Sequence, residues 1–204
     1  MYSKKDNLFI GGLILNFILA SLVGITLLYG LSWVDKSYTL VIDEKSEKLS
    51  NVSDLTILMV NGHVFVLNYY NQNTNQAMNT ENYTALVNEA SSLINKLNKD
   101  IKNPSEKVFT MNINIAFNEY RKTVESIIQN KGQVKSEKLE EVYQKTIVAC
   151  DKLGNYYFTE IDKTNRNNTK ISNLVISTGL TITILTQVFI LILLFFKKKK
   201  NNKL

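Results

Sequence analysis

Cysteine, histidine and proline are almost absent from this sequence of 204 residues. Cys150, His63 and Pro104 are the only residues of their kinds. One cysteine and one histidine provide neither an intrachain disulfide nor a metal site built from several such ligands. The sequence also lacks the glycine-rich phosphate loop and the HExxH and GxSxG patterns of common enzyme families. We therefore expect a protein that is not an enzyme and that holds no metal and no cofactor.

An excess of either charge is absent between residues 35 and 173, which hold 17 basic and 17 acidic side chains. The formal net charge of +6 comes from the two ends of the chain. The residues responsible are Lys4, Lys5, Lys197 to Lys200 and Lys203, less the acidic Asp6. A basic face of the kind that binds nucleic acid is missing, so we expect no nucleic-acid partner.

Charged residues are also absent from two long apolar segments, residues 8–34 and 174–196. Each exceeds the roughly 20 helical residues that cross a bilayer core of about 30 Å. Lysines adjoin both segments on their outer sides, and lysines mark the cytoplasmic ends of membrane spans. We therefore predict a two-pass protein of the cell membrane, with cytoplasmic ends at 1–7 and 197–204 and residues 35–173 outside. A cleaved signal peptide is the alternative for 8–34, but its apolar core is usually about 7–15 residues.

Small and polar residues recur every four positions in the first apolar segment, at Gly12, Asn16, Ala20 and Gly24. This spacing places them on one helical face. Small residues let membrane helices approach closely, and an amide in lipid favours a partner helix. We predict that this stripe packs against another helix. The alternative is that such residues are simply common in membrane spans, and Gln187 in the second segment has the same two interpretations.

The middle of the chain shows helical periodicity, because its apolar residues recur at intervals of three and four. Breaks at the asparagine-rich residues 68–80, at Pro104 and at Gly132 divide it into helices near 35–72, 80–103, 105–131 and 136–173. Ser105 is the expected cap of the third helix. The predicted fold is all-α, an antiparallel up-down four-helix bundle that is continuous with two transmembrane helices.

The residues that we expect to face the bundle core follow from this periodicity. In the first helix they are Val34, Tyr38, Val41, Val52, Leu55, Met59, Val66 and Tyr69, with Lys45, Lys48 and Gly62 as interruptions. In the second they are Tyr83, Leu86, Ala90, Leu93, Leu97 and Ile101, and in the third Val108, Met111, Ile115 and Ile127. In the fourth they are Leu139, Val142, Thr146, Cys150, Leu153, Tyr157, Thr164 and Ile171.

One layer of polar residues is a candidate ligand site. The antiparallel alignment puts the only histidine at the height of charged residues from the other three helices. The candidate residues are His63, Glu89, Glu119, Arg121 and Lys145. Because arginine holds carboxylates through two hydrogen bonds, such a layer would suit a small anion or amino acid. The alternative is a solvated belt of surface charges, although Gly62, a destabilising choice inside a helix, favours a special site.

Residues 13–40 read LILNFILASLVGITLLYGLSWVDKSYTL and lead directly into a helix with regularly spaced apolar residues. This stretch resembles the start of the four-helix-bundle sensor domain of bacterial methyl-accepting chemotaxis receptors and related transmembrane sensors. The resemblance implies an extracytoplasmic module that senses a ligand or a protein and is usually dimeric. Receptors of this type continue into a HAMP linker and signalling helices, whereas only KKKKNNKL follows the second apolar segment here.

We therefore expect a membrane-anchored sensor or accessory module that acts through a membrane partner in signal transduction or chemotaxis. Its expected partners are the membrane, a small-molecule ligand, and either a second copy or a full-length receptor. The alternative is a structural membrane protein or a truncated receptor remnant with no ligand.

Overall fold

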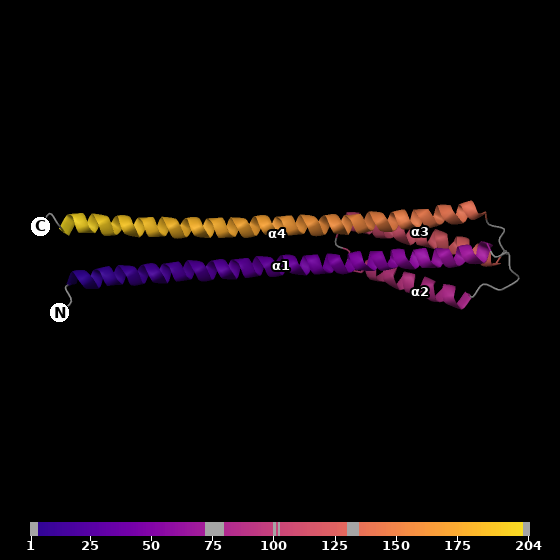
Figure 1. The fold of residues 1–204 in the computed structure, drawn as a ribbon, viewed down its shortest axis with the longest axis horizontal. Helices are drawn as coiled ribbons and strands as arrows, with labels where there is room; N and C mark the ends of the chain where they lie inside the picture. The colour runs from indigo at the N-terminus through magenta and orange to yellow at the C-terminus, as the bar shows by residue number, and fades with distance from the viewer. Residues whose placement is uncertain (1–3, 72–79, 100, 102, 130–134, 202–204) are drawn as a thin grey trace. The chain divides into compact units, whose positions relative to one another are not determined.

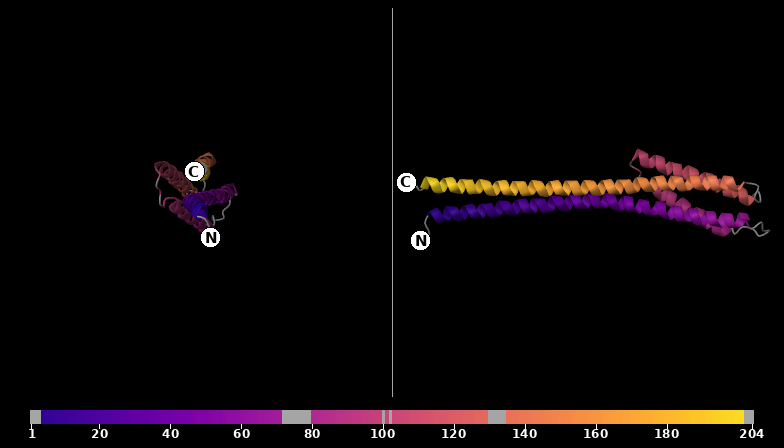
Figure 2. Two further views of the ribbon diagram at one scale, coloured as in Figure 1. Left: turned by 90° about the vertical axis from the view of Figure 1, so that its left-hand side faces the viewer. Right: turned by 45° about the horizontal axis from the view of Figure 1, so that its top comes forward.

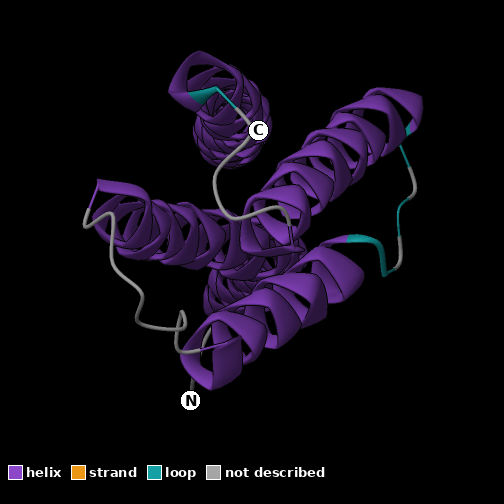
Figure 3. Ribbon diagram, turned by 90° about the vertical axis from the view of Figure 1, so that its right-hand side faces the viewer, coloured by secondary structure: helices purple, strands orange, loops and turns teal. Residues whose placement is uncertain are grey.

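The computed structural model describes residues 4–71, 80–99, 101, 103–129 and 135–201. Within these ranges all regular structure is helical, with no strand (Figure 3). Figure 1 labels the helices, which are α1 (Lys4–Asn71), α2 (Thr80–Leu97), α3 (Pro104–Gln129) and α4 (Ser136–Asn201). The predicted all-α helical bundle is confirmed.

The chain divides into two compact units. The first contains residues 1–41 and 163–204, and the second contains residues 42–162. Because α1 and α4 are both uninterrupted, each contributes residues to both units. The second unit also contains all of α2 and α3. Its residues 42–162 cover less of the chain than the predicted segment 35–173. The expected core residues Val41 and Ile171 lie outside it and are exposed, so these two predictions were wrong.

The first unit contains two helical segments that are long and apolar enough to cross a membrane. Here α1 and α4 lie side by side (Figures 1 and 2). Their contact is close where a glycine faces a larger side chain, because a Cβ atom built on Gly179 would overlap Leu27. A Cβ atom on Gly30 would lie 4.0 Å from Val175 Cγ1. Other large apolar side chains of this unit, such as Phe17 and Leu28, are exposed.

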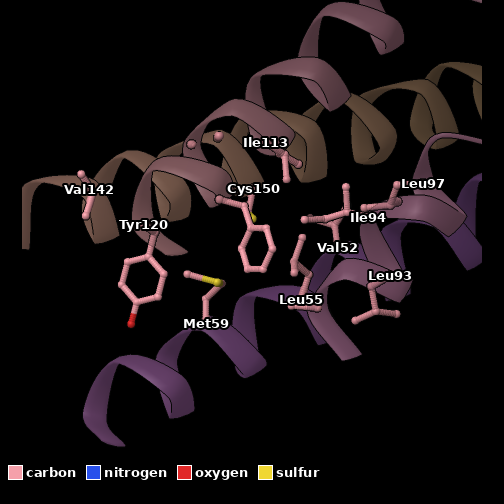
Figure 4. Close-up of a cluster of buried hydrophobic side chains, with 14 of the residues drawn as sticks. Val52, Leu55, Met59, Leu93, Ile94, Leu97, Ile113, Tyr120, Val142 and Cys150 are labelled. Carbon is pink, nitrogen blue, oxygen red and sulfur yellow. The ribbon is translucent and has the colours of Figure 1, made fainter. Parts of the chain in front are cut away.

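The second unit has a buried apolar core to which all four helices contribute (Figure 4). The predicted core residues that are buried on α1 are Val52, Leu55, Met59 and Val66. On α4 they are Leu139, Val142, Thr146, Cys150, Leu153 and Tyr157. The periodicity of these two helices is therefore confirmed within the unit. A Cβ atom on Gly154 would lie 3.7 Å from Val52 Cγ1, and His63, further along α1, contacts Glu140, which comes earlier on α4. The two helices therefore run in opposite directions here.

The predicted core face of α3 was wrong, apart from Ile127. Val108, Met111 and Ile115 are exposed. The buried side chains of α3 are Glu106, Thr110, Ile113, Ala116, Phe117, Tyr120, Val124 and Ile127. They recur at three and four, like the other core faces. The helix has apolar residues on two faces. The prediction selected the exposed face instead of the face that carries Ile113, Phe117 and Val124.

The start of α3 also differs from the prediction. The helix begins at Pro104, and the side-chain oxygen of Asn103 accepts a hydrogen bond of 2.8 Å from the backbone N–H of Ser105. Asn103 is thus the cap and Pro104 the first helical residue, where its missing N–H has no cost. The prediction that Ser105 is the cap was wrong. The predicted break at residues 68–80 was too long, because α1 continues to Asn71 and α2 begins at Thr80. Residues 72–79 and the predicted break at Gly132 lie outside the described residues.

Candidate functional site

A carboxylate is buried at the start of α3, where three other side chains contact it. Glu106 is 1% exposed. Its Oε1 atom accepts hydrogen bonds from Lys48 Nζ at 2.7 Å and from the Tyr157 hydroxyl at 3.0 Å. Its Oε2 atom accepts one from Lys45 Nζ at 3.1 Å. We call this group of residues from α1, α3 and α4 the Glu106 cluster.

The carboxylate of Glu106 is ionised despite its burial. Burial alone raises the pKa of a carboxyl group, but here hydrogen bonds from Lys48, Lys45 and Tyr157 outweigh it and hold the pKa of Glu106 below its ordinary value. Lys48 also donates to the backbone carbonyl of Lys99 at 3.3 Å, so its buried ammonium group has more than one acceptor. The carboxylate and both ammonium groups of the cluster are therefore hydrogen-bonded, and we interpret it as a structural clamp between three helices.

The Glu106 cluster was not predicted as a unit, although the sequence contained a signal for it. Lys45 and Lys48 interrupt the apolar stripe of the first helix at core positions. A charged residue is almost never buried without a partner. Two lysines on a core stripe therefore indicate a buried acid on a neighbouring helix.

A second buried polar layer surrounds the only histidine. The Nε2 atom of His63 lies 3.1 Å from Glu140 Oε2. The imidazole ring stacks on Tyr143 with the ring centroids 3.8 Å apart, and it lies 6.0 Å from the ring of Tyr120. Burial lowers the pKa of His63 more than the hydrogen bond to Glu140 raises it, so the ring is neutral at pH 7. The neutral ring then donates from Nε2 to the carboxylate.

Several polar atoms near this layer are buried without a hydrogen-bond partner among the described residues. They are His63 Nδ1 and the hydroxyl oxygens of Tyr83 and Tyr120. Each such group costs about 1–3 kcal/mol relative to a satisfied one. Burial, as the largest cause, also raises the pKa of both tyrosines well above the ordinary value of 10, so both hydroxyls are uncharged at any physiological pH.

The other members of the predicted ligand layer do not converge on His63 in the described contacts. Arg121 pairs with Glu125 of its own helix at 3.5 Å. Lys145 lies 2.8 Å from Glu141 and 4.0 Å from Glu119, in side chains that are half exposed. Glu89 is exposed on α2. Of the predicted layer, only His63 is buried as a whole residue, and Glu119, Arg121 and Lys145 form ion pairs near the surface. The Nε atom of Arg121 is itself buried, with no hydrogen-bond partner among the described residues.

Two residues of the predicted stripe in the first apolar segment, Asn16 and Ala20, lie beside α4 of the same chain. Gly12, Asn16, Ala20 and Gly24 are all partly buried, but a Cβ atom built on Gly12 or Gly24 would have no neighbouring atom within 4 Å among the described residues. Asn16 and Ala20 border a small cavity together with Thr183, Thr186 and Gln187. The Asn16 side-chain oxygen is buried there with no hydrogen-bond partner among the described residues. Asn16 and Ala20 are therefore placed next to α4, whereas the packing of Gly12 and Gly24 against another helix stays a prediction.

The free thiol lies in the core of the second unit. Cys150 is fully buried, and burial raises its pKa to about 11. The group is therefore an uncharged thiol at neutral pH, which is a poor nucleophile. This environment agrees with the interpretation of Cys150 as a small packing residue.

Comparisons of the chain with protein-family models, with curated protein sequences and with solved structures find no match. The assignment of function therefore depends on the two buried polar layers and on the apolar pair of helices.

Proposed function

We propose that the protein is a membrane-anchored module that receives a small ligand or a protein partner outside the cell membrane and acts through another membrane protein. In this proposal the apolar segments of α1 and α4 cross the membrane, with both ends of the chain in the cytoplasm. The second unit is then the receiving bundle, as the resemblance to chemotaxis receptors implies.

The observation that carries this proposal is the continuity of α1 and α4. Each helix includes an exposed, charge-free apolar segment and also lines a buried polar layer of the bundle. Lys48 and His63 belong to α1, and Tyr157 and Glu140 belong to α4. A change in either layer therefore acts on the same two helices that would cross the membrane. Helix shifts of about 1–2 Å are a common form of such switching.

The outward faces of the apolar segments are the surfaces available to a membrane partner. Phe17 and Leu28 are exposed on α1, whereas Ala20 faces α4. A photoreactive amino acid placed at Phe17 or Leu28 should form a crosslink in native membranes, and the same amino acid at Ala20 should not. An adduct with a different membrane protein supports the accessory role, and an adduct of twice the chain mass supports a homodimer.

A structural membrane protein remains the second candidate. The observation that favours it is the pairing of Glu119, Arg121 and Lys145 with surface neighbours, because this arrangement leaves no assembled site for an anion. This candidate predicts no specific adduct at Phe17 or Leu28. Absence of adducts at both positions would therefore count against the sensor or accessory role.

A further inference from the structure

Two buried hydroxyl groups lie at a cavity of the second unit. Tyr83 on α2 is 6% exposed and Tyr120 on α3 is 3% exposed. Both residues border the cavity, and neither hydroxyl oxygen has a hydrogen-bond partner among the described residues. In Figure 4 the Tyr120 hydroxyl lies at the edge of the apolar cluster, with the Tyr120 ring near Met59. Native proteins rarely bury a hydroxyl without a partner, so a pair at one cavity points to a missing one.

The rest of the cavity wall is apolar and comes from α1, α2 and α3. It includes Met59, Leu86 and Phe117, and the cavity volume is about 10 Å³. This is room for roughly one water molecule. A larger molecule would have to displace Leu86 and Val87 of α2, which line the cavity and are only partly buried.

Gly62 forms part of the same wall. A Cβ atom built at this position would lie 4.0 Å from Leu86 Cδ1, which is ordinary contact without overlap. Alanine would therefore fit, and it would stabilise the helix relative to glycine. Gly62 therefore leaves room in the cavity, although glycine makes this part of α1 less stable than alanine would.

The groups around the cavity carry no net charge. The two tyrosine hydroxyls are uncharged, and Arg121 and Glu125, whose charges act on the hydroxyl of Tyr83, form an ion pair with each other. A carboxylate ligand would lose its hydration and would meet the carboxylate of Glu125, which is paired with Arg121. An uncharged polar group would gain the hydrogen bonds that the hydroxyls lack.

We propose that this cavity binds a small uncharged amphiphile, whose hydroxyl or carbonyl group bonds Tyr83 and Tyr120 and whose apolar body packs on Met59, Leu86 and Phe117. The proposal rests on the proposed function, because it names the ligand class of the receiving bundle. This uncharged ligand replaces the small anion or amino acid that we predicted from the sequence.

The test is a titration of the full chain in lipid nanodiscs with 4-fluorophenol, followed by fluorine NMR. The wild-type protein should show a saturable bound resonance. Tyr83→Phe and Tyr120→Phe should each weaken binding about ten-fold, because each loses one hydrogen bond to the ligand. Gly62→Ala should abolish binding, because its methyl group occupies the cavity.

The matched controls make the same chemical changes elsewhere. Tyr157→Phe removes a buried hydroxyl that already donates to Glu106, and Gly154→Ala adds a methyl group in ordinary contact with Val52. Both should bind 4-fluorophenol as tightly as the wild type. Protection of the buried Cys150 from a thiol reagent shows that each variant is folded.

Two results would overturn the proposal. A wild-type protein without a saturable resonance would mean that the cavity holds water only. Equal resonances in all variants would mean that the probe dissolves in the lipid or binds elsewhere. Neither result bears on membrane orientation or on crosslinking at Phe17, so failure of the ligand site and failure of the proposed function are distinguishable.

Discussion

At the scale of single residues, the buried Glu106 should contribute more to the stability of the bundle than any charged side chain of the surface ion pairs. Glu106→Gln removes the charge with little change in volume and leaves the buried ammonium of Lys48 with only the more distant Glu44, at 3.8 Å, and a carbonyl. We expect a loss of about 3 kcal/mol in the free energy of unfolding of the bundle. The temperature at which Cys150 becomes accessible to a thiol reagent should fall accordingly.

The control for this prediction is Glu141→Gln. Glu141 pairs with Lys138 at 3.1 Å and with Lys145 at 2.8 Å, but all three side chains are about half exposed. Ion pairs at the surface contribute little. The Cys150 labelling temperature should therefore remain close to that of the wild type. A similar loss in both variants would contradict the structural role of the Glu106 cluster.

His63 should make the bundle less stable as the pH falls below 6.5. Burial lowers the pKa of His63 in the folded state, and the interaction with Glu140, which raises this pKa, is too weak to reverse the effect. The unfolded chain therefore binds the proton more readily, so the stability present above pH 6.5 is lost on acidification. Near-ultraviolet circular dichroism of the buried tyrosines should show a lower melting temperature at pH 5.5 than at pH 7.

This pH window belongs to one group, because His63 is the only histidine. His63→Gln should flatten the dependence between pH 7 and pH 5.5 and leave the acid unfolding at lower pH. If the wild-type melting temperature instead rose on acidification, the pairing with Glu140 would dominate over burial.

At the scale of helices, the two faces of α3 should respond differently to substitution. Ile113 is fully buried, so Ile113→Ala should cost about 2–4 kcal/mol of unfolding free energy. Met111 is exposed, so Met111→Ala should change the stability by less than about 0.5 kcal/mol. Thermal labelling of Cys150 measures both. A larger loss of stability for Met111→Ala than for Ile113→Ala would contradict the buried face in the structure and favour the face predicted from the sequence.

The helices themselves could be predicted because their signals are local. The uncharged apolar segments, the periodicity of α1 and α4 and the break at Pro104 all agree with the structure. The core face of α3 could not be predicted in the same way, because this helix has apolar residues on two faces and the polar Glu106 and Thr110 on the buried one. Their burial depends on Lys45, Lys48 and Tyr157, which come from other helices.

The candidate site was predictable only in part. The sequence placed His63 and the unusual Gly62 beside it inside the bundle, and both residues are buried there. The side chains that meet there were different, because Arg121 pairs within α3 while the tyrosines Tyr120 and Tyr143 face His63. Sequence spacing determines which face of a helix a residue occupies, but it does not determine which of several neighbours a long charged side chain selects.

At the scale of the whole molecule, the account depends on which side of the membrane holds the bundle. The lysines at both ends of the chain predict that both ends are cytoplasmic. The only native thiol, Cys150, is buried, so a cysteine introduced at an exposed position can be labelled with little background. Asn112 is exposed on α3, and Lys199 lies in the basic run after the second apolar segment.

The most direct measurement is labelling of Asn112→Cys and Lys199→Cys with a membrane-impermeant maleimide in intact cells, with the wild-type chain as background control. The account predicts labelling of Asn112→Cys in intact cells and labelling of Lys199→Cys only after the membrane is permeabilised. Labelling of Lys199→Cys in intact cells, or protection of Asn112→Cys until permeabilisation, would contradict an extracytoplasmic bundle anchored by two membrane spans.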